Sequence, residues 1–174
     1  MKPFDIRTAP LEIERRFLIE YPDIEALRRM PGYRVIQISQ TYLKSDGEFV
    51  GGRIRRILEG SKVTYVYTYK ERLSDMTRRE YEKNISSGEY TELLKHKKPN
   101  TITIEKDRHI FRFEGLVYEL DVYDFWDDKA SLEAEVKSED TSIPIPPCVK
   151  LIKDVTADRR YNNSHLAVNR GVIE

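Results

Sequence analysis

The chain carries its most informative pattern in residues 11–19, LEIERRFLI, where two glutamates flank a single apolar residue. Residues i and i+2 of a β-strand point to the same face of a sheet. Glu12 and Glu14 therefore share one face, and Ile13 lies on the other. The stretch predicts a β-strand with one charged face and one apolar face.

The same spacing of charges recurs along the chain. It occurs in Arg53/Arg55, in Arg78/Glu80 continuing to Glu82, in Lys106/Arg108, in Glu119/Asp121 and in Glu133/Glu135, and Lys70 follows Thr68 at this spacing. The usual explanation is that each strand has a solvated face and a face packed on a core. Several pairs, however, carry charges of one sign, and like charges on one face repel unless an opposite charge lies between them. We therefore expect the charged faces to meet in a polar lumen that binds a polyanion together with divalent cations.

The composition argues for one globular domain and against several classes of protein. A length of 174 residues fits a single domain, residues 1–174, with a sizeable core. With 30 basic and 30 acidic residues the net charge is zero, which argues against nucleic-acid binding through a global positive field. The single cysteine, Cys148, excludes an intramolecular disulfide and a multi-cysteine metal site. Without a signal peptide or a long apolar run, we predict a cytoplasmic protein with no membrane partner.

Segments rich in β-forming residues dominate the chain and predict a mainly β fold of the α+β type. The expected strands are residues 11–19, 33–43, 49–58, 62–70, 78–85, 101–105, 108–113, 116–125 and 131–137. Short helices are expected at 23–30, at 87–97 and at about 147–153. So many strands joined by hairpin turns favour closure into an antiparallel β-barrel with peripheral helices, because closure leaves no exposed edge.

Nine motifs follow one another along most of the chain. They are EIERRFL (12–18), QTYL (40–43), RIR (53–55), TYK (68–70), RREYE (78–82), EKDR (105–108), ELDVY (119–123), EAE with SED (133–140), and DVT with RYNNS and LA (154–167). In this order they resemble the motifs of the CYTH superfamily, the triphosphate tunnel metalloenzymes, over residues 11–167. One such motif is weak evidence, whereas nine in the correct order are strong evidence. Arg16 stands where the first motif usually has a lysine.

The resemblance implies a closed eight-stranded antiparallel barrel whose lumen is a charged tunnel for a triphosphate with Mg²⁺ or Mn²⁺. The metal ligands it implies are Glu12, Glu14, Asp121, Glu133 and Glu135. The substrate-binding residues it implies are Arg16, Arg53, Arg55, Lys70, Glu80, Glu82, Lys106 and Arg108. We expect catalytic roles for Glu12, Glu14, Lys70 and Lys153.

The residue types suit these roles on chemical grounds as well. Arginine makes planar bidentate contacts with phosphate oxygens and lysine supplies a point charge, while Mg²⁺ prefers carboxylate, phosphate and water oxygens. The glutamate pairs Glu12/Glu14 and Glu133/Glu135 come from the two ends of the predicted sheet. They can meet only if the first and last strands lie side by side, as they do in a closed barrel.

The activity expected from the resemblance is hydrolysis of the terminal phosphate of a triphosphate, with inorganic tripolyphosphate as the substrate and a divalent metal ion as cofactor. Two alternatives stay open. One is an adenylate cyclase, which makes cyclic AMP and pyrophosphate from ATP. The other is a noncatalytic module that binds polyphosphate or a nucleotide. The expected partner is a small-molecule triphosphate, and an exposed barrel wall could also support a homodimer.

Overall fold

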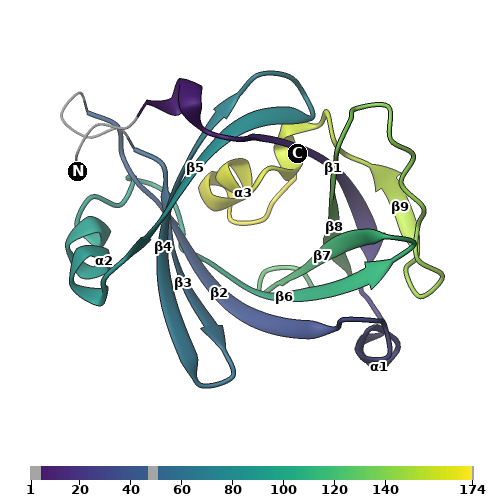
Figure 1. The fold of residues 1–174 in the computed structure, drawn as a ribbon. Helices are drawn as coiled ribbons and strands as arrows, with labels where there is room; N and C mark the ends of the chain where they lie inside the picture. The colour runs from purple at the N-terminus through teal and green to yellow at the C-terminus, as the bar shows by residue number, and fades with distance from the viewer. Residues whose placement is uncertain (1–4, 47–50, 174) are drawn as a thin grey trace.

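The computed structural model describes residues 5–46 and 51–173, in which antiparallel strands form a ring (Figure 1). The strands are β1 (Leu11–Glu20), β2 (Arg34–Tyr42), β3 (Arg53–Glu59), β4 (Lys62–Arg72), β5 (Thr77–Ile85), β6 (Ile104–Phe113), β7 (Leu116–Tyr123), β8 (Lys129–Val136) and β9 (Leu151–Asp154). The helices are α1 (Ile24–Arg28), α2 (Ser87–Leu94) and α3 (Asn163–Asn169), with 3₁₀ turns η1 (Ile6–Thr8) and η2 (Arg159–Tyr161). No described helix is long and apolar enough to cross a membrane.

The strand order closes the sheet on itself. Neighbouring strands follow the order β5-β4-β3-β2-β6-β7-β8-β1, and β1 also pairs with β5, so eight antiparallel strands complete a barrel. The first residues of β1 make this closure, from Leu11 opposite Arg79 to Ile13 opposite Thr77. Further along the same edge, β9 replaces β5 as the partner of β1. The predicted closed eight-stranded antiparallel barrel is therefore confirmed.

The hydrophobic core of this molecule lies largely outside the ring of strands. Phe17 and Ile19 of β1 pack with Leu120 of β7 and Leu132 of β8, beneath Leu27 of α1. These side chains alternate with the charged ones along each strand, so the apolar face points outward and the charged face points inward. The lumen is thus left to polar groups.

Two further apolar clusters hold the other helices. On the far side of the ring, Tyr90 of α2 packs with Ile54 and Tyr67 on the outer face of β3 and β4. Leu166 of α3 packs with Leu18 and Trp126, and Figure 1 shows α3 (yellow) within the outline of the ring of strands. The third helix therefore lies where it can contribute to the wall of the lumen.

Three sequence predictions about the elements need correction. The helix expected at 147–153 is wrong, because this segment ends in β9, which pairs with the edge of β1 left beyond β5. The strands expected at 101–105 and 108–113 are replaced by one strand, β6, which begins at Ile104 and in which Lys106 and Asp107 continue the alternation. Helix α3 was not expected, because its seven residues offer only two buried apolar positions, Leu166 and Ala167. Of the strand expected at 49–58, the first two residues lie outside the described part of the chain, and β3 begins at Arg53.

Candidate functional site

Charged side chains from most strands of the barrel face a single cavity of about 280 Å³ in the lumen. Its lining residues are Glu12, Glu14, Arg16, Arg53, Arg55, Lys70, Arg78, Glu80, Glu82, Arg108, Glu119, Glu133 and Asn163. All of them are charged except Asn163, which α3 contributes. The structure therefore brings together most of the residues to which the sequence assigned a site role.

The first and last strands of the barrel meet as the sequence predicted. In the register of β1 and β8, Glu14 lies opposite Glu135 and Arg16 lies opposite Glu133. The Arg16 guanidinium donates to Glu133 (Nε–Oε1 2.6 Å) and to Glu14 (Nη2–Oε1 3.1 Å). Its remaining nitrogen, Nη1, donates to Asn162 Oδ1 at 2.6 Å. Arg16 thus ties both acidic strands to the segment that leads into α3.

Below this layer, Asp121 is surrounded by cations. Its carboxylate accepts hydrogen bonds from Lys106 Nζ at 2.5 Å and from Arg108 Nε at 2.7 Å and Nη2 at 2.8 Å. Burial opposes ionisation of Asp121, but Arg108 and Lys106 outweigh it and hold its pKa below the ordinary value. Burial lowers the pKa of Lys106 to about 8, against the attraction of Asp121. Asp121 therefore fixes two cations, and its oxygens are already occupied.

A lysine and two glutamates form a cluster of ion pairs on the opposite wall. Lys70 Nζ lies 2.7 Å from Glu12 Oε2 and also forms an ion pair with Glu80. Burial raises the pKa of Glu12 to about 7; Lys70 opposes the shift, and a hydrogen bond from Glu12 to Glu80 adds to it. Burial also disfavours ionisation of Glu80, but Lys70 and this hydrogen bond hold its pKa at about 2. Near neutral pH, the carboxyl pair can therefore carry one proton.

The two arginines of β3 that line the lumen cavity differ in their partners. Arg55 donates to Glu82 (Nη2–Oε2 2.5 Å) and to Thr68. Arg53 Nη1 lies 3.5 Å from Gln40 Oε1, and its buried Nε has no hydrogen-bond partner. No carboxylate among residues 5–46 and 51–173 pairs with Arg53. This partly buried arginine consequently offers an anion in the lumen a charge that is in no ion pair among the described residues.

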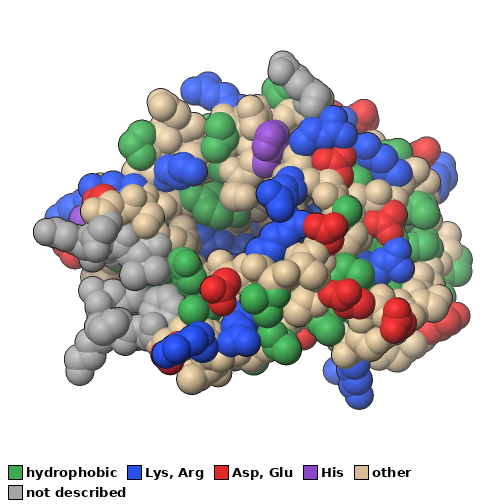
Figure 2. All heavy atoms as spheres, turned by 90° about the horizontal axis from the view of Figure 1, so that it is seen from above, with side chains coloured by type: hydrophobic (Ala, Val, Ile, Leu, Met, Phe, Trp, Pro, Cys, Tyr) green, Lys and Arg blue, Asp and Glu red, His purple; other side chains and the backbone are tan. Residues whose placement is uncertain are grey.

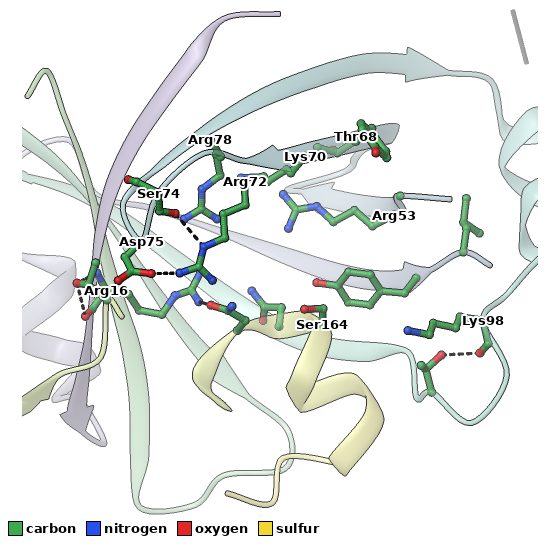
Figure 3. A pocket seen from close by; sticks show the side chains of 18 residues that line it. Arg16, Arg53, Thr68, Lys70, Arg72, Ser74, Asp75, Arg78, Lys98 and Ser164 are labelled. Carbon is green, nitrogen blue, oxygen red and sulfur yellow. Dashed lines mark hydrogen bonds and ion pairs between the residues drawn. The ribbon is translucent and has the colours of Figure 1, made fainter. Parts of the chain in front are cut away.

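One opening of the lumen is rich in cations, and we call it the basic mouth. It is a cavity of about 400 Å³ whose charged lining residues are Arg16, Arg53, Lys70, Arg72, Asp75, Arg78 and Lys98. Figure 3 shows Arg53, Lys70 and Arg78 along one wall and Ser164 of α3 along the facing wall. On the face drawn in Figure 2, Lys and Arg side chains gather in and around a central hollow.

A second opening, the acidic mouth, borders the same lumen. It is a cavity of about 500 Å³ whose charged lining residues are Asp5, Glu12, Glu80, Glu82 and Glu135. Its described lining includes no lysine or arginine. Three of these acidic residues also line the lumen cavity. Four cations of the basic mouth line the lumen cavity as well. The site therefore has one cationic and one anionic approach.

The lumen fits a hard divalent cation by the chemistry of its donors. Glutamate carboxylates are the kind of oxygen ligand that Mg²⁺ and Mn²⁺ prefer, particularly alongside phosphate oxygens. Within the described residues, no group of three or more metal-ligating side chains is already gathered as a complete site. Glu12, Glu14 and Glu133 instead pair with basic side chains, so a bound ion would have to share or replace these partners.

Four residues with a predicted role do not line the lumen cavity: Lys106, Asp121, Lys153 and Glu135, the last of which lines the acidic mouth. Three residues that line it had no predicted role: Arg78, Glu119 and Asn163. Lys153 is exposed on β9, with Nζ 4.7 Å from the centre of the Tyr161 ring. Lys106 lies beneath Arg108 and is buried against Asp121. Arg78 pairs with Glu14 (Nη2–Oε1 2.6 Å), and its position two residues before Glu80 is the sequence signal that could have placed it in the lumen.

Comparison with known proteins agrees with this geometry. The model of the CYTH domain family matches residues 10–145, which is most of the chain. This protein belongs to the CYTH family. The inorganic triphosphatase of Acetivibrio thermocellus is 29% identical to it over 160 residues, which cover 91% of this chain and 94% of the relative.

Solved structures of CYTH-like barrels resemble the present one. The crystal structure of the inorganic triphosphatase NE1496 has a TM-score of 0.54 and 27% identity, covering 90% of this chain and 94% of that one. The PH1819 protein from Pyrococcus horikoshii OT3 has a TM-score of 0.58 and 22% identity, covering 74% and 80% of the two chains, and shows the shared fold.

Proposed function

We propose that this CYTH protein hydrolyses the terminal phosphate of a triphosphate chain and that inorganic tripolyphosphate is its substrate. The observation that carries the proposal is the lumen cavity, where arginine and lysine side chains from β1, β3, β4, β5 and β6 surround one space of about 280 Å³. Its resemblance to two inorganic triphosphatases supports the same activity.

The basic side chains bind and orient the substrate. Arg53 has no carboxylate partner among the described residues, so it can bind a phosphate oxygen without first breaking an ion pair. Arg55, Lys70 and Arg108 face the same cavity and can share their charge between glutamates and phosphate oxygens. Charge placed there in advance stabilises the negative charge that develops as a phosphoanhydride bond breaks.

The carboxylates of the lumen are proposed to hold Mg²⁺ or Mn²⁺ together with the substrate. Glu12, Glu14 and Glu133 offer oxygens within the lumen cavity, and Glu135 offers oxygens at the adjoining acidic mouth, all from the two neighbouring strands β1 and β8. When bound, the ion supplies polarisation of the phosphate oxygens. Because burial raises the pKa of Glu12 to about 7, a metal ion bound at Glu12 would compete with a proton near neutral pH.

A product-resolved assay tests the proposal. Purified protein is incubated with tripolyphosphate, ATP or thiamine triphosphate, each with Mg²⁺ or Mn²⁺, and the products are separated. We expect orthophosphate release that is fastest from tripolyphosphate and is lost when a chelator is added. Cyclic AMP and pyrophosphate from ATP would instead identify a cyclase, and tight binding without turnover would identify a binding module.

A further inference from the structure

Asn163 is the one uncharged residue among the described side chains that line the lumen cavity. It is the first residue of α3, and it also lines the basic mouth. Only 6% of its surface is exposed. A buried side-chain amide normally has hydrogen-bond partners for both its oxygen and its nitrogen, so the partners of this amide indicate what it does in the lumen.

The oxygen of the amide is already bound. The Tyr123 hydroxyl, at the end of β7, donates to Asn163 Oδ1 at 2.8 Å, and it lies 3.2 Å from Ser131 Oγ of β8. Burial, together with the nearby carboxylates of Asp121 and Glu133, raises the pKa of Tyr123 well above its ordinary value, so the hydroxyl keeps its proton. Because that single proton goes to Asn163, Ser131 is left to donate to the tyrosine oxygen. This buried chain of hydrogen bonds fixes the orientation of the amide.

The nitrogen of the amide has no partner. With Oδ1 held by Tyr123, the Nδ2 group lies on the other branch of the Asn163 carboxamide, and no residue in 5–46 or 51–173 accepts a hydrogen bond from it. This nitrogen is not sealed in protein either, because every buried side-chain nitrogen or oxygen that lacks a partner in the described chain belongs to another residue. Asn163 therefore presents two N–H donors to the cavity that it lines.

The neighbouring asparagine holds this amide in place. Asn162 occupies the N-cap position of α3, but its side chain does not cap the helix. Its Oδ1 instead accepts from Arg16 Nη1 at 2.6 Å, and Arg16 is in turn paired with Glu14 and Glu133. A side chain suited to stabilise the end of a helix is thus used to tie the start of α3 to the two acidic strands. The same arginine that lines the lumen consequently fixes the position of Asn163 beside it.

We propose that Asn163 binds a phosphate oxygen of the substrate through Nδ2, and that Tyr123 and Ser131 are positioning residues that hold the amide in its donating orientation. This inference rests on the proposed triphosphatase function and adds a neutral donor to the cations of the lumen. A metal ion would need the oxygen of the amide, which Tyr123 occupies, and would be repelled by the N–H groups. An anionic oxygen is the ligand that completes the hydrogen bonds of this side chain.

The donor role of Asn163 is tested with tripolyphosphate and Mg²⁺. Asn163→Ala removes the donor and should raise the KM by about three- to tenfold. Asn163→Asp keeps the shape and the bond from Tyr123 but turns an anion toward the phosphate, so its KM should rise by about 30-fold or more. Asn169→Asp, which adds the same charge at the exposed end of α3, is the matched control and should keep a KM near that of wild type.

The role of Tyr123 is tested through its dependence on Asn163. Tyr123→Phe frees the amide to rotate and should raise the KM by about two- to threefold while kcat stays near the wild-type value. In the double variant with Asn163→Ala, loss of the hydroxyl should have no further effect on KM, because no amide is left to orient. Tyr33→Phe, which removes the hydroxyl that pairs with His109, is the matched control. Additive effects of the two substitutions would overturn the positioning role and show that Tyr123 only stabilises the barrel.

Calorimetry with tripolyphosphate and a chelator separates this inference from the proposed activity, because it needs no turnover. A Kd that rises from wild type to Asn163→Ala and again to Asn163→Asp supports the donor role even if no substrate is hydrolysed. Circular dichroism checks that each variant is folded, and the isosteric Asn163→Asp carries the comparison if Asn163→Ala is not.

Three results would overturn the inference. Wild-type binding that both Asn163 variants leave unchanged would overturn the donor role alone. Tighter Mg²⁺ binding by Asn163→Asp in a separate titration, without weaker binding of tripolyphosphate, would overturn it in favour of a metal ligand. Absence of tripolyphosphate binding by wild type would overturn the proposed function as well.

Discussion

The basic mouth and the acidic mouth border one lumen, yet they carry opposite charge. The difference arises within single strands. Along β1, the inward positions run from Glu12 through Glu14 to Arg16, and along the antiparallel β5 they run from Glu82 through Glu80 to Arg78. The two strands therefore change sign in the same direction in space. The protein has no net charge, yet the inward-facing strand positions give its lumen an acidic end and a basic end.

Because the two openings carry opposite charge, they attract different ligands. A polyanion is attracted to the basic mouth and repelled by the five carboxyl-bearing residues of the acidic mouth. A divalent cation is attracted to the acidic mouth and repelled by the basic mouth. We expect substrate to enter through the basic mouth, and four substitutions can break or sharpen this comparison.

The largest effect should come from Asp121, which anchors the cations beneath the lumen. In Asp121→Asn, Lys106 and Arg108 stay buried without their full counterion, and the free energy of unfolding should fall by about 3–5 kcal/mol. Urea denaturation followed by circular dichroism measures this change. Asp124→Asn, which alters an exposed aspartate just beyond β7, is the control. Equal stability of the two variants would show that the buried charges are held by other means.

The second-largest effect should come from Glu14, which forms ion pairs with both Arg16 and Arg78. Replacing it by glutamine leaves two neighbouring cations with less opposing charge and removes an oxygen donor proposed for the metal ion. We expect kcat to fall by about 100-fold and the Mg²⁺ concentration needed for half-maximal rate to rise. Glu20→Gln, at the exposed end of the same strand, is the matched control. A wild-type rate with unchanged metal dependence in Glu14→Gln would contradict the assignment.

A smaller effect should come from Arg53, one of the four cations that line both the lumen and the basic mouth. Arg53→Gln removes one charge-assisted contact with phosphate, so the KM for tripolyphosphate should rise by about 10- to 50-fold. Arg56→Gln lies on the same strand but lines a different cavity, and it should change KM little. If both variants raise the KM equally, the arginines of β3 attract the substrate only through their long-range charge and Arg53 makes no specific contact with it.

The smallest effect should come from Glu82 at the acidic mouth. Glu82→Gln frees Arg55 from its ion pair and reduces repulsion of anions there. Because Glu82 is half exposed, we expect a change of only about two- to threefold, seen as a lower KM for tripolyphosphate at low salt that disappears at high salt. A higher KM would mean that Glu82 orients Arg55 for the substrate and that this contact outweighs the repulsion.

The sequence predicted the barrel and most of its lumen because both depend on one local rule. The i, i+2 spacing fixes which side chains share a face, so the inward positions of Arg55, Glu80 and Glu133 could be predicted without long-range information. Closure could be inferred as well, since Glu14 and Glu135 need neighbouring strands in order to meet.

What the sequence could not predict depends on contacts between distant segments. Lys153 was expected near the site, but β9 pairs with the free edge of β1 and leaves it exposed. Asp121 was expected to bind metal, and only the fold reveals that Lys106 and Arg108 occupy its oxygens.

The central place of β1 also bears on how the chain folds during synthesis. Its first three residues pair with β5 and the residues from Ile13 to Glu20 pair with β8, so that Ile13 lies opposite Thr77 on one edge and Val136 on the other. A ribosome that adds about 5–20 residues per second needs on the order of ten seconds to make the segment between them. During this time β1 has no β8 partner, and its apolar outer face lacks Leu132 and Val149, which pack with it in the complete fold. We therefore expect the nascent chain to depend on chaperones until β8 emerges and the ring can close.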